Sequence, residues 1–161
     1  MIRDPNTGFR NVQFVNCISN TNLISICQVK NIQTNKLYIA KIFMKKILTK
    51  EEEDKFIHEM ILYSQLHNPA ILQLIKFSLF SYDPKFFPAF LTEYMVNESL
   101  GLFFEKECCG VFPKEFTNSK KYIILLGIIS GMKYLHSQGL IHRNLNPTNI
   151  LLDENFYPKI C

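Results

Sequence analysis

This chain of 161 residues has no C-x-x-C pair, no apolar run long enough to cross a membrane and no apolar signal core at its start. Its five cysteines are odd in number and irregularly spaced, which argues against a disulfide framework or a zinc site and favours reduced thiols. The most apolar run, residues 122–130, is far shorter than the roughly 20 residues of a membrane-spanning helix, and lysines bracket it. We therefore expect a cytoplasmic protein with no membrane segment.

The charge pattern also excludes some classes of partner. The net charge is +4, and the lysines are spread along the chain, with one denser group at Lys41, Lys45, Lys46 and Lys50. Such a group is typical of a solvated surface, whereas a nucleic-acid site would need tighter clustering. Hydrophobic residues make up 47% of the chain and charged residues 20%, which predicts a globular core. The length fits one domain or a fragment of a larger one.

The first half of the chain contains short β-rich runs. Residues 12–18, 23–29 and 37–43 are separated by polar, asparagine-rich turns, which predicts three antiparallel strands. Two further strand candidates, 71–80 and 86–92, follow with a turn at 81–85 between them.

A helix is predicted between these two groups of strands. Thr49 precedes Glu52 by three residues, as in a capping box. Glu59 falls on the apolar face of this helix, which is formed by Phe56, Met60, Tyr63 and Leu66. A carboxylate on such a face is costly unless it is paired, so Glu59 is expected to have a basic partner. The alternative is a glutamate at the edge of the face that reaches water.

The second half is more helical. A short helix over 99–107 and a long one over 119–136 are expected, with residues 93–98 irregular between the two halves. Gly127 and Gly131 within the long helix indicate close packing. A small hairpin is expected from 150–152 and 157–160. The stretch 140–153 places polar residues between two aliphatic runs, which predicts a strand, a functional loop and a second strand.

That stretch, L-I-H-R-N-L-N-P-T-N-I-L-L-D, resembles the catalytic loop of protein kinases, whose pattern is H-R-D-L-x-x-x-N. Upstream, L-Y-I-A-K at 37–41 resembles the lysine motif of the third kinase strand, and Glu59 stands where the family has its helix glutamate. H-N-P-A-I at 67–71 and L-T-E-Y-M at 91–95 resemble the following linker and the interlobe hinge. The resemblance covers residues 12–161.

The resemblance implies an α+β, bilobal kinase fold. Residues 1–96 would be a complete small lobe with the hinge, built from a five-stranded antiparallel sheet and one helix, and residues 97–161 a partial helical large lobe. It also implies ATP with Mg²⁺ as cofactors, with Lys41 paired to Glu59 to hold the phosphates and Asn149 as a metal ligand. A purely structural ion pair is the alternative for Lys41 and Glu59. The implied nucleotide-binding positions are Ile18, Ile26, Thr92, Glu93 and Met95.

The chain departs from the family pattern in four places. Ser19, Thr21 and Ile24 replace the three glycines that cover the phosphates, so side chains restrict that turn. Asn144 replaces the catalytic aspartate, and Asn146 stands where serine/threonine kinases usually have a lysine. The sequence also ends before a D-F-G motif, which is expected to leave an apolar face of the 119–136 helix exposed.

These departures predict a catalytically inactive pseudokinase fragment that binds ATP weakly at most and acts through protein partners, not through nucleic acid or membrane. One alternative is a longer parent chain that phosphorylates Ser, Thr or Tyr residues of protein substrates at a reduced rate. Another is a non-functional truncated gene product.

Overall fold

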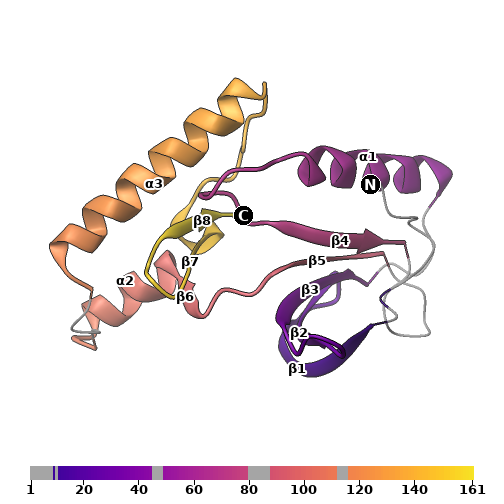
Figure 1. The fold of residues 1–161 in the computed structure, drawn as a ribbon, viewed down its shortest axis with the longest axis horizontal. Helices are drawn as coiled ribbons and strands as arrows, with labels where there is room; N and C mark the ends of the chain where they lie inside the picture. The colour runs from indigo at the N-terminus through magenta and orange to yellow at the C-terminus, as the bar shows by residue number, and fades with distance from the viewer. Residues whose placement is uncertain (1–8, 10, 45–48, 80–87, 112–115) are drawn as a thin grey trace. The chain divides into compact units, whose positions relative to one another are not determined.

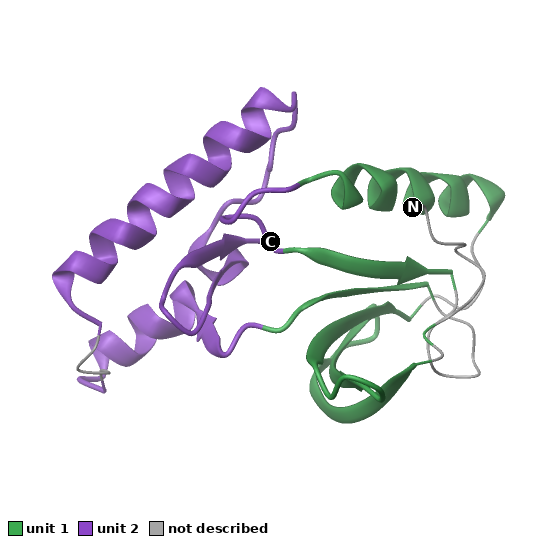
Figure 2. Ribbon diagram, in the orientation of Figure 1, with its two compact units in different colours: residues 1–66, 73–94 green, residues 67–72, 95–161 purple. Residues whose placement is uncertain are grey.

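A computed structural model describes residues 9, 11–44, 49–79, 88–111 and 116–161. The chain forms two compact units, one from residues 1–66 and 73–94 and the other from residues 67–72 and 95–161 (Figure 2). The predicted turn at 81–85 lies outside the described residues.

The first unit contains a five-stranded antiparallel sheet in the order β1-β2-β3-β5-β4 (Figure 1). This sheet confirms the predicted small-lobe architecture. Its strands are β1 (Val12–Asn20), β2 (Ile24–Asn31), β3 (Leu37–Phe43), β4 (Leu74–Ser78) and β5 (Ala89–Glu93). The β2–β3 turn forms because the Asn31 side chain accepts hydrogen bonds from the backbone N–H groups of Gln33 and Thr34, both at 2.9 Å. A buried cluster holds the sheet together: Phe9, Cys27, Val29, Ala40, Ile42, Ala89 and Leu91.

Helix α1 (Lys50–Ser64) begins at the predicted capping box. The Thr49 hydroxyl accepts from the Glu52 N–H at 3.3 Å, and the Glu52 carboxylate accepts from the Thr49 N–H at 2.9 Å. At the start of the helix, the Lys50 Nζ lies 3.0 Å from an Asp54 carboxylate oxygen. This carboxylate raises the pKa of Lys50 through a hydrogen bond and its negative charge. The helix packs against the sheet through aromatic side chains, with the Phe56 ring edge-on to Phe77 at 6.3 Å between centroids.

The second unit combines two helices with a small sheet in the order β6-β7-β8. Its elements are β6 (Asn97–Ser99), α2 (Leu100–Cys108), α3 (Asn118–Ser137), the 3₁₀ turn η1 (Pro147–Asn149), β7 (Ile150–Leu152) and β8 (Pro158–Ile160). Their shared core consists of Leu100, Phe103, Phe116, Ile124, Ile150 and Leu152. The two predicted helices and the predicted hairpin are confirmed.

Helix α3 packs closely on β8, as its glycines predicted. A Cβ atom on Gly127 would collide with the Pro158 ring, and one on Gly131 would lie 2.8 Å from Cδ1 of Ile160. The segment 67–72 groups with this unit because its backbone bonds to it. The N–H of His67 donates to the Tyr134 hydroxyl at 2.9 Å, and the N–H of Leu72 donates to the Ile160 carbonyl at 2.9 Å.

Two sequence-based expectations were wrong. Residues 97 and 98, expected to be irregular, and Ser99, expected to begin a helix, form β6 because this segment pairs with β7. Residues 140–141, expected to be a strand before the functional loop, are not a strand in the structure. Leu140 is instead tied to the end of α3, since its N–H donates to the Leu135 carbonyl at 3.0 Å, and Ile141 is 72% exposed.

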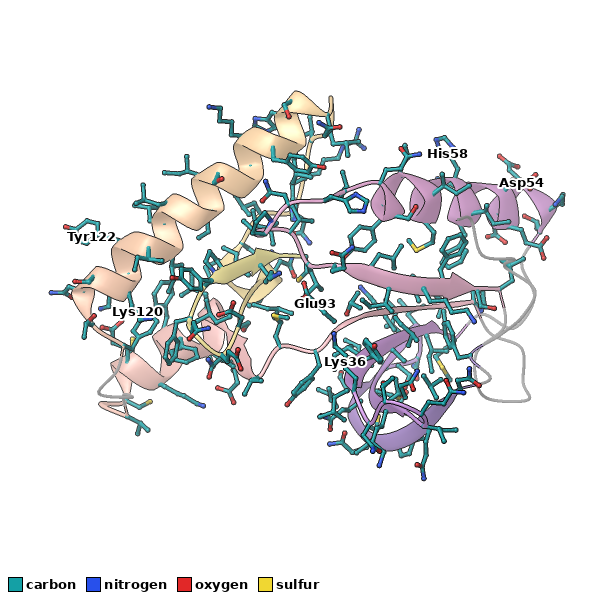
Figure 3. The ribbon with its side chains drawn as sticks, in the orientation of Figure 1. Lys36, Asp54, His58, Glu93, Lys120 and Tyr122 are labelled. Atoms are coloured by element: carbon teal, nitrogen blue, oxygen red, sulfur yellow. The ribbon has the colours of Figure 1, made fainter. Side chains whose placement is uncertain are left out.

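Helix α3 carries an exposed apolar stripe, which we call the α3 stripe and define as Tyr122, Leu125, Leu126 and Ile129. Tyr122 is 70% exposed and Leu126 is 64% exposed, and Figure 3 shows Tyr122 pointing away from the helix. The expected exposure of an apolar face on this helix is thus confirmed. Among the described residues, no helix combines the length and apolar character needed to cross a bilayer.

Candidate functional site

Lys41 lies in the middle of the first unit's sheet. It stands on β3 between Ile26 of β2 and Phe90 of β5, which are its register partners. The side chain is half-buried, and its Nζ lies 5.8 Å from the centroid of the Phe90 ring, in cation–π range. A fixed ammonium group at this position can attract an anion such as a phosphate.

Glu59 does not meet Lys41. Among the residues that the structure describes, the ion pairs include no contact between these two side chains, and Glu59 is exposed on α1. Its helical neighbour Met60 is buried in the cluster with Leu74 and Phe77, whereas Glu59 reaches solvent. The structure therefore gives the alternative arrangement for Glu59, a glutamate at the edge of the apolar face, since water solvates its charge at no burial cost.

The β1–β2 turn, at the place of the family's glycine loop, is closed by a side chain. The Thr21 hydroxyl oxygen accepts from the backbone N–H groups of Leu23 at 3.3 Å and Ile24 at 3.0 Å. The same hydroxyl donates to the Ile24 carbonyl at 3.0 Å. Backbone N–H groups in such turns are the usual donors to phosphate oxygens. In this chain, two of these N–H groups already donate hydrogen bonds to the Thr21 hydroxyl.

The remaining predicted nucleotide-binding residues are distributed over both units. Ile18 on β1 is exposed and Ile26 on β2 is half-buried. Thr92 is only 4% exposed and lies within the sheet, next to Ile39 of β3 and Leu74 of β4.

Glu93 at the end of β5 is held in place by Gln73. The Glu93 carboxylate accepts from the Gln73 N–H at 2.8 Å, and the Glu93 N–H donates to the Gln73 carbonyl at 3.1 Å. Because this N–H is already bonded within the unit, it is not free for a ligand. Met95 is half-buried and belongs to the second unit.

Hydrogen bonds of asparagine side chains stabilise the conformation of the loop 142–149. The Asn146 side-chain oxygen accepts from the N–H groups of Thr148 at 2.9 Å and Asn149 at 3.2 Å, so it caps η1. Its amide nitrogen donates to both the backbone and the side-chain oxygen of Asn144, at 3.1 and 3.0 Å. Asn146 therefore has a structural role, and it brings the side chains of Asn144 and Asn146 together.

His142 ties the loop to the end of β8. Its Nε2 lies 3.1 Å from the Cys161 carbonyl oxygen, so this nitrogen must donate. Its Nδ1 accepts from the Asn144 N–H at 3.3 Å. In this arrangement Nε2 is the donor and Nδ1 is the acceptor. His142 belongs to the polar residues of the predicted functional loop, and the structure gives it a positioning role.

Asn149 is the one predicted metal ligand. Its amide nitrogen donates to the Asn144 carbonyl at 2.9 Å, and within the described part of the chain its side-chain oxygen accepts no hydrogen bond. An amide oxygen suits a hard cation, but Mg²⁺ prefers six oxygen ligands, usually including carboxylates and phosphates. The described residues contain no cluster of three or more His, Cys, Asp or Glu side chains that could complete such a site. The residues present thus fit Mg²⁺ as a single ligand only.

The chemistry available to these residues is limited. Asn144 offers an amide oxygen that can accept a hydrogen bond from a hydroxyl group, and Lys41 offers one positive charge in the other unit. None of the three asparagine amides in the loop can take up a proton near neutral pH. Sequence reasoning placed Thr21 in a turn restricted by side chains but did not predict that its hydroxyl closes the turn by hydrogen bonds, as Ser and Thr hydroxyls can do.

Comparison with known proteins agrees with the kinase resemblance of the sequence motifs. Residues 22–161 match the family described as "Protein kinase domain". The chain is 35% identical over 112 residues to "Rust resistance kinase Lr10" of Triticum aestivum, covering 68% of this chain and 17% of that protein. It is 30% identical over 137 residues to "Mitogen-activated protein kinase HOG1" of Exserohilum turcicum, covering 84% of this chain and 38% of that protein.

A third relative gives the same picture. The chain is 30% identical over 130 residues to "3-phosphoinositide-dependent protein kinase B" of Dictyostelium discoideum, covering 80% of this chain and 13% of that protein. The chain therefore spans well under half the length of each of these relatives.

Proposed function

Because this chain belongs to the protein kinase domain family, we propose that it is a catalytically inactive member, which binds ATP weakly at most and acts by binding other proteins. The observation that carries the proposal is the folded loop 142–149. Its hydrogen bonds hold the loop in order, yet an amide, Asn144, stands at the position of the family's catalytic aspartate.

The loss of the aspartate removes the proton acceptor. In the family, the aspartate accepts the proton of the substrate hydroxyl while that hydroxyl attacks the γ-phosphate. Replacing a general base by a group that cannot be protonated typically costs about 10²–10⁴ in rate. Asn146 adds to this loss because it supplies no positive charge to the transferred phosphate, and its amide is used to cap η1.

Weak nucleotide binding follows from the first unit. The family uses ATP and Mg²⁺, and its glycine-rich loop covers the phosphates. In this chain, the Thr21 hydroxyl already bonds the N–H groups of Leu23 and Ile24. A phosphate would have to displace that side chain, and the positive charge of Lys41 would attract the phosphate.

A protein-binding role in the cytoplasm fits the remaining features. All five cysteines are free thiols, and the exposed α3 stripe is an apolar surface of the kind that proteins use to bind one another. A protein partner is therefore favoured over nucleic acid or a membrane.

A second candidate function rests on the residues that are retained. Lys41 and Asn149 occupy the phosphate-lysine and metal-ligand positions of the family, and each of the three relatives described above is named as a kinase. A longer parent chain could thus transfer phosphate from ATP to Ser, Thr or Tyr residues at a reduced rate. The sequence of the transcript beyond the codon for Cys161 tests this candidate, because a D-F-G motif there would favour it.

Thermal unfolding with and without Mg-ATP separates the proposals. We expect a cooperative transition that millimolar Mg-ATP raises by no more than about 2 °C, because a ligand stabilises in proportion to RT ln(1 + [L]/Kd). A larger rise that the Lys41→Ala variant abolishes would contradict weak binding and favour the active parent. The absence of a cooperative transition would identify a non-functional product.

A further inference from the structure

Two thiols lie opposite each other on neighbouring strands of the first unit. Cys17 of β1 and Cys27 of β2 are direct register partners in the antiparallel ladder, beside an irregularity in β1. Opposed residues in such ladders have Cα atoms about 4.5–5.5 Å apart. That spacing falls inside the range of about 4.4–6.8 Å that a disulfide requires.

The two thiols differ in their surroundings. Cys17 is exposed, and its S–H group lies 3.5 Å from the Ser19 carbonyl and 3.9 Å from the carbonyl of Ile26, the residue before Cys27. The side chain of Cys17 therefore lies toward β2. Cys27 is only 3% exposed, in the core of the sheet, with its sulfur 3.4 Å from the Ser25 hydroxyl. A dissolved reagent can reach Cys17 first, whereas Cys27 can react only with a group already on the sheet.

We propose that Cys17 and Cys27 form a reversible oxidative modification site, in which a small-molecule disulfide such as oxidised glutathione closes a bridge between β1 and β2. The Cys17 thiolate attacks one glutathione sulfur, forming a mixed disulfide and releasing one glutathione thiolate. The Cys27 sulfur then attacks the Cys17 sulfur, giving the internal disulfide and a second glutathione, which leaves with the Cys27 proton. Overall, two protein thiols are oxidised and one glutathione disulfide is reduced to two thiols.

The bridge would constrain the turn between the two strands. It closes a loop that contains the Thr21–Ile24 turn, so it limits how far β1 can separate from β2. In a reducing compartment both thiols remain free, and the bridge forms when the glutathione pool becomes more oxidised. This inference does not depend on whether the chain binds ATP.

The other cysteines give a background for the test. Cys108 and Cys109 are adjacent and exposed at the end of α2, and Cys161 is exposed at the end of the chain. The variant Cys108→Ser/Cys109→Ser/Cys161→Ser keeps only the proposed pair. Trypsin cleaves after Arg10 and Lys30, so both remaining cysteines fall in one peptide.

The experiment treats this variant with oxidised glutathione, natively and in concentrated urea, and then alkylates all free thiols with N-ethylmaleimide in urea. Mass spectrometry of peptide 11–30 reports the bridge as a loss of two hydrogens with no alkylation. We expect the bridge to form faster natively than in urea and to raise the Tm by about 5 °C, reversibly with dithiothreitol.

Single-thiol variants are the matched controls. With Cys27→Ser added, Cys17 is expected to accumulate as a stable glutathione adduct. With Cys17→Ser added, Cys27 is expected to remain unmodified in the native protein. Either a persistent adduct on Cys17 beside an alkylated Cys27, or a bridge that forms no faster natively than in urea, would overturn the proposal.

Discussion

At the scale of single residues, one hydroxyl group occupies backbone donors in the β1–β2 turn, where the kinase family has its glycine-rich loop. The Thr21 hydroxyl accepts hydrogen bonds from the backbone N–H groups of Leu23 and Ile24, and it donates one to the Ile24 carbonyl. A glycine at this position has no side chain to make these bonds and leaves the donors open. The Thr21 hydroxyl thus stabilises the turn and occupies donors that an anion could otherwise use.

Replacing Thr21 by glycine should strengthen nucleotide binding. The Thr21→Gly variant frees two N–H donors, and a hydrogen bond to a charged group contributes about 1.5–3 kcal/mol, so we expect Mg-ATP affinity to rise by at least about fivefold. Titration calorimetry measures the change. The control is Thr34→Gly in the β2–β3 turn, where the Thr34 hydroxyl also accepts a backbone bond, from Lys36. Equal affinities in wild type and Thr21→Gly would contradict this account of the turn.

Asn146 should be required for the stability of the second unit. Asn146→Ala removes the cap of η1 and the bonds to Asn144, so we expect the free energy of unfolding to fall by about 1–2 kcal/mol. Urea unfolding followed by circular dichroism measures this loss. Asn155→Ala is the control, because the hydrogen bonds described for Asn155 all use its backbone. A loss no greater than that of the control would mean that the loop does not depend on this cap.

Some of the candidate site residues could be predicted from the sequence, but the environment of Glu59 could not. Asn144, Asn146 and Asn149 were found from their motif, and the structure brings all three together through hydrogen bonds of their side chains. The state of Glu59 was not predictable, since a helical pattern shows which face a residue lies on but not whether the helix turns that residue toward Lys41. The structure leaves Glu59 exposed.

At the scale of elements, the strands and helices with clear local sequence signals were predictable from the sequence. Strands that form only because a neighbouring strand pairs with them were not. The capping box of α1 and the β-branched runs of β2 and β3 are local signals. Strand β6, N-E-S, has no strand propensity and exists because β7 lies beside it. Conversely, the aliphatic residues 140–141 have strand propensity but no partner strand in the structure.

Helix α3 offers a direct test of packing against propensity. Gly131→Ala improves helix propensity by about 1 kcal/mol, yet the new Cβ would lie 2.8 Å from Ile160 and 3.1 Å from Ala70. We expect overpacking to prevail, with a net destabilisation of about 1–2 kcal/mol in urea unfolding. The neighbouring Ser130→Ala, on the exposed face, is expected to be neutral or slightly stabilising. A stabilised Gly131→Ala variant would show that α3 does not pack closely on β8.

At the scale of the whole molecule, the chain combines membership of the protein kinase domain family with an exposed apolar surface on helix α3. Residues 22–161 match the protein kinase domain family, and the chain carries an exposed apolar stripe along its longest helix. Each unit has its own buried core, so substitutions in either core are expected to lower the stability of that unit. An apolar surface of this kind promotes association with other molecules.

The α3 stripe should control self-association of the isolated chain. The double variant Leu126→Gln/Ile129→Gln removes exposed apolar side chains, so we expect weaker self-association in sedimentation velocity and an unfolding free energy changed by less than about 0.5 kcal/mol. Ile128→Gln is the contrasting control, since Ile128 packs against the core and its replacement should destabilise the unit. Unchanged sedimentation of the double variant would show that the stripe does not mediate association.

The central claim, that this kinase-family chain retains the architecture but not the chemistry of phosphoryl transfer, is tested most directly by one rate. The initial rate of transfer from radiolabelled Mg-ATP to casein is measured for the wild-type chain and for Lys41→Ala, which lacks the positive charge of Lys41 on β3. The account predicts that the two rates are equal and no higher than the rate without protein. A wild-type rate clearly above background that Lys41→Ala abolishes would contradict it.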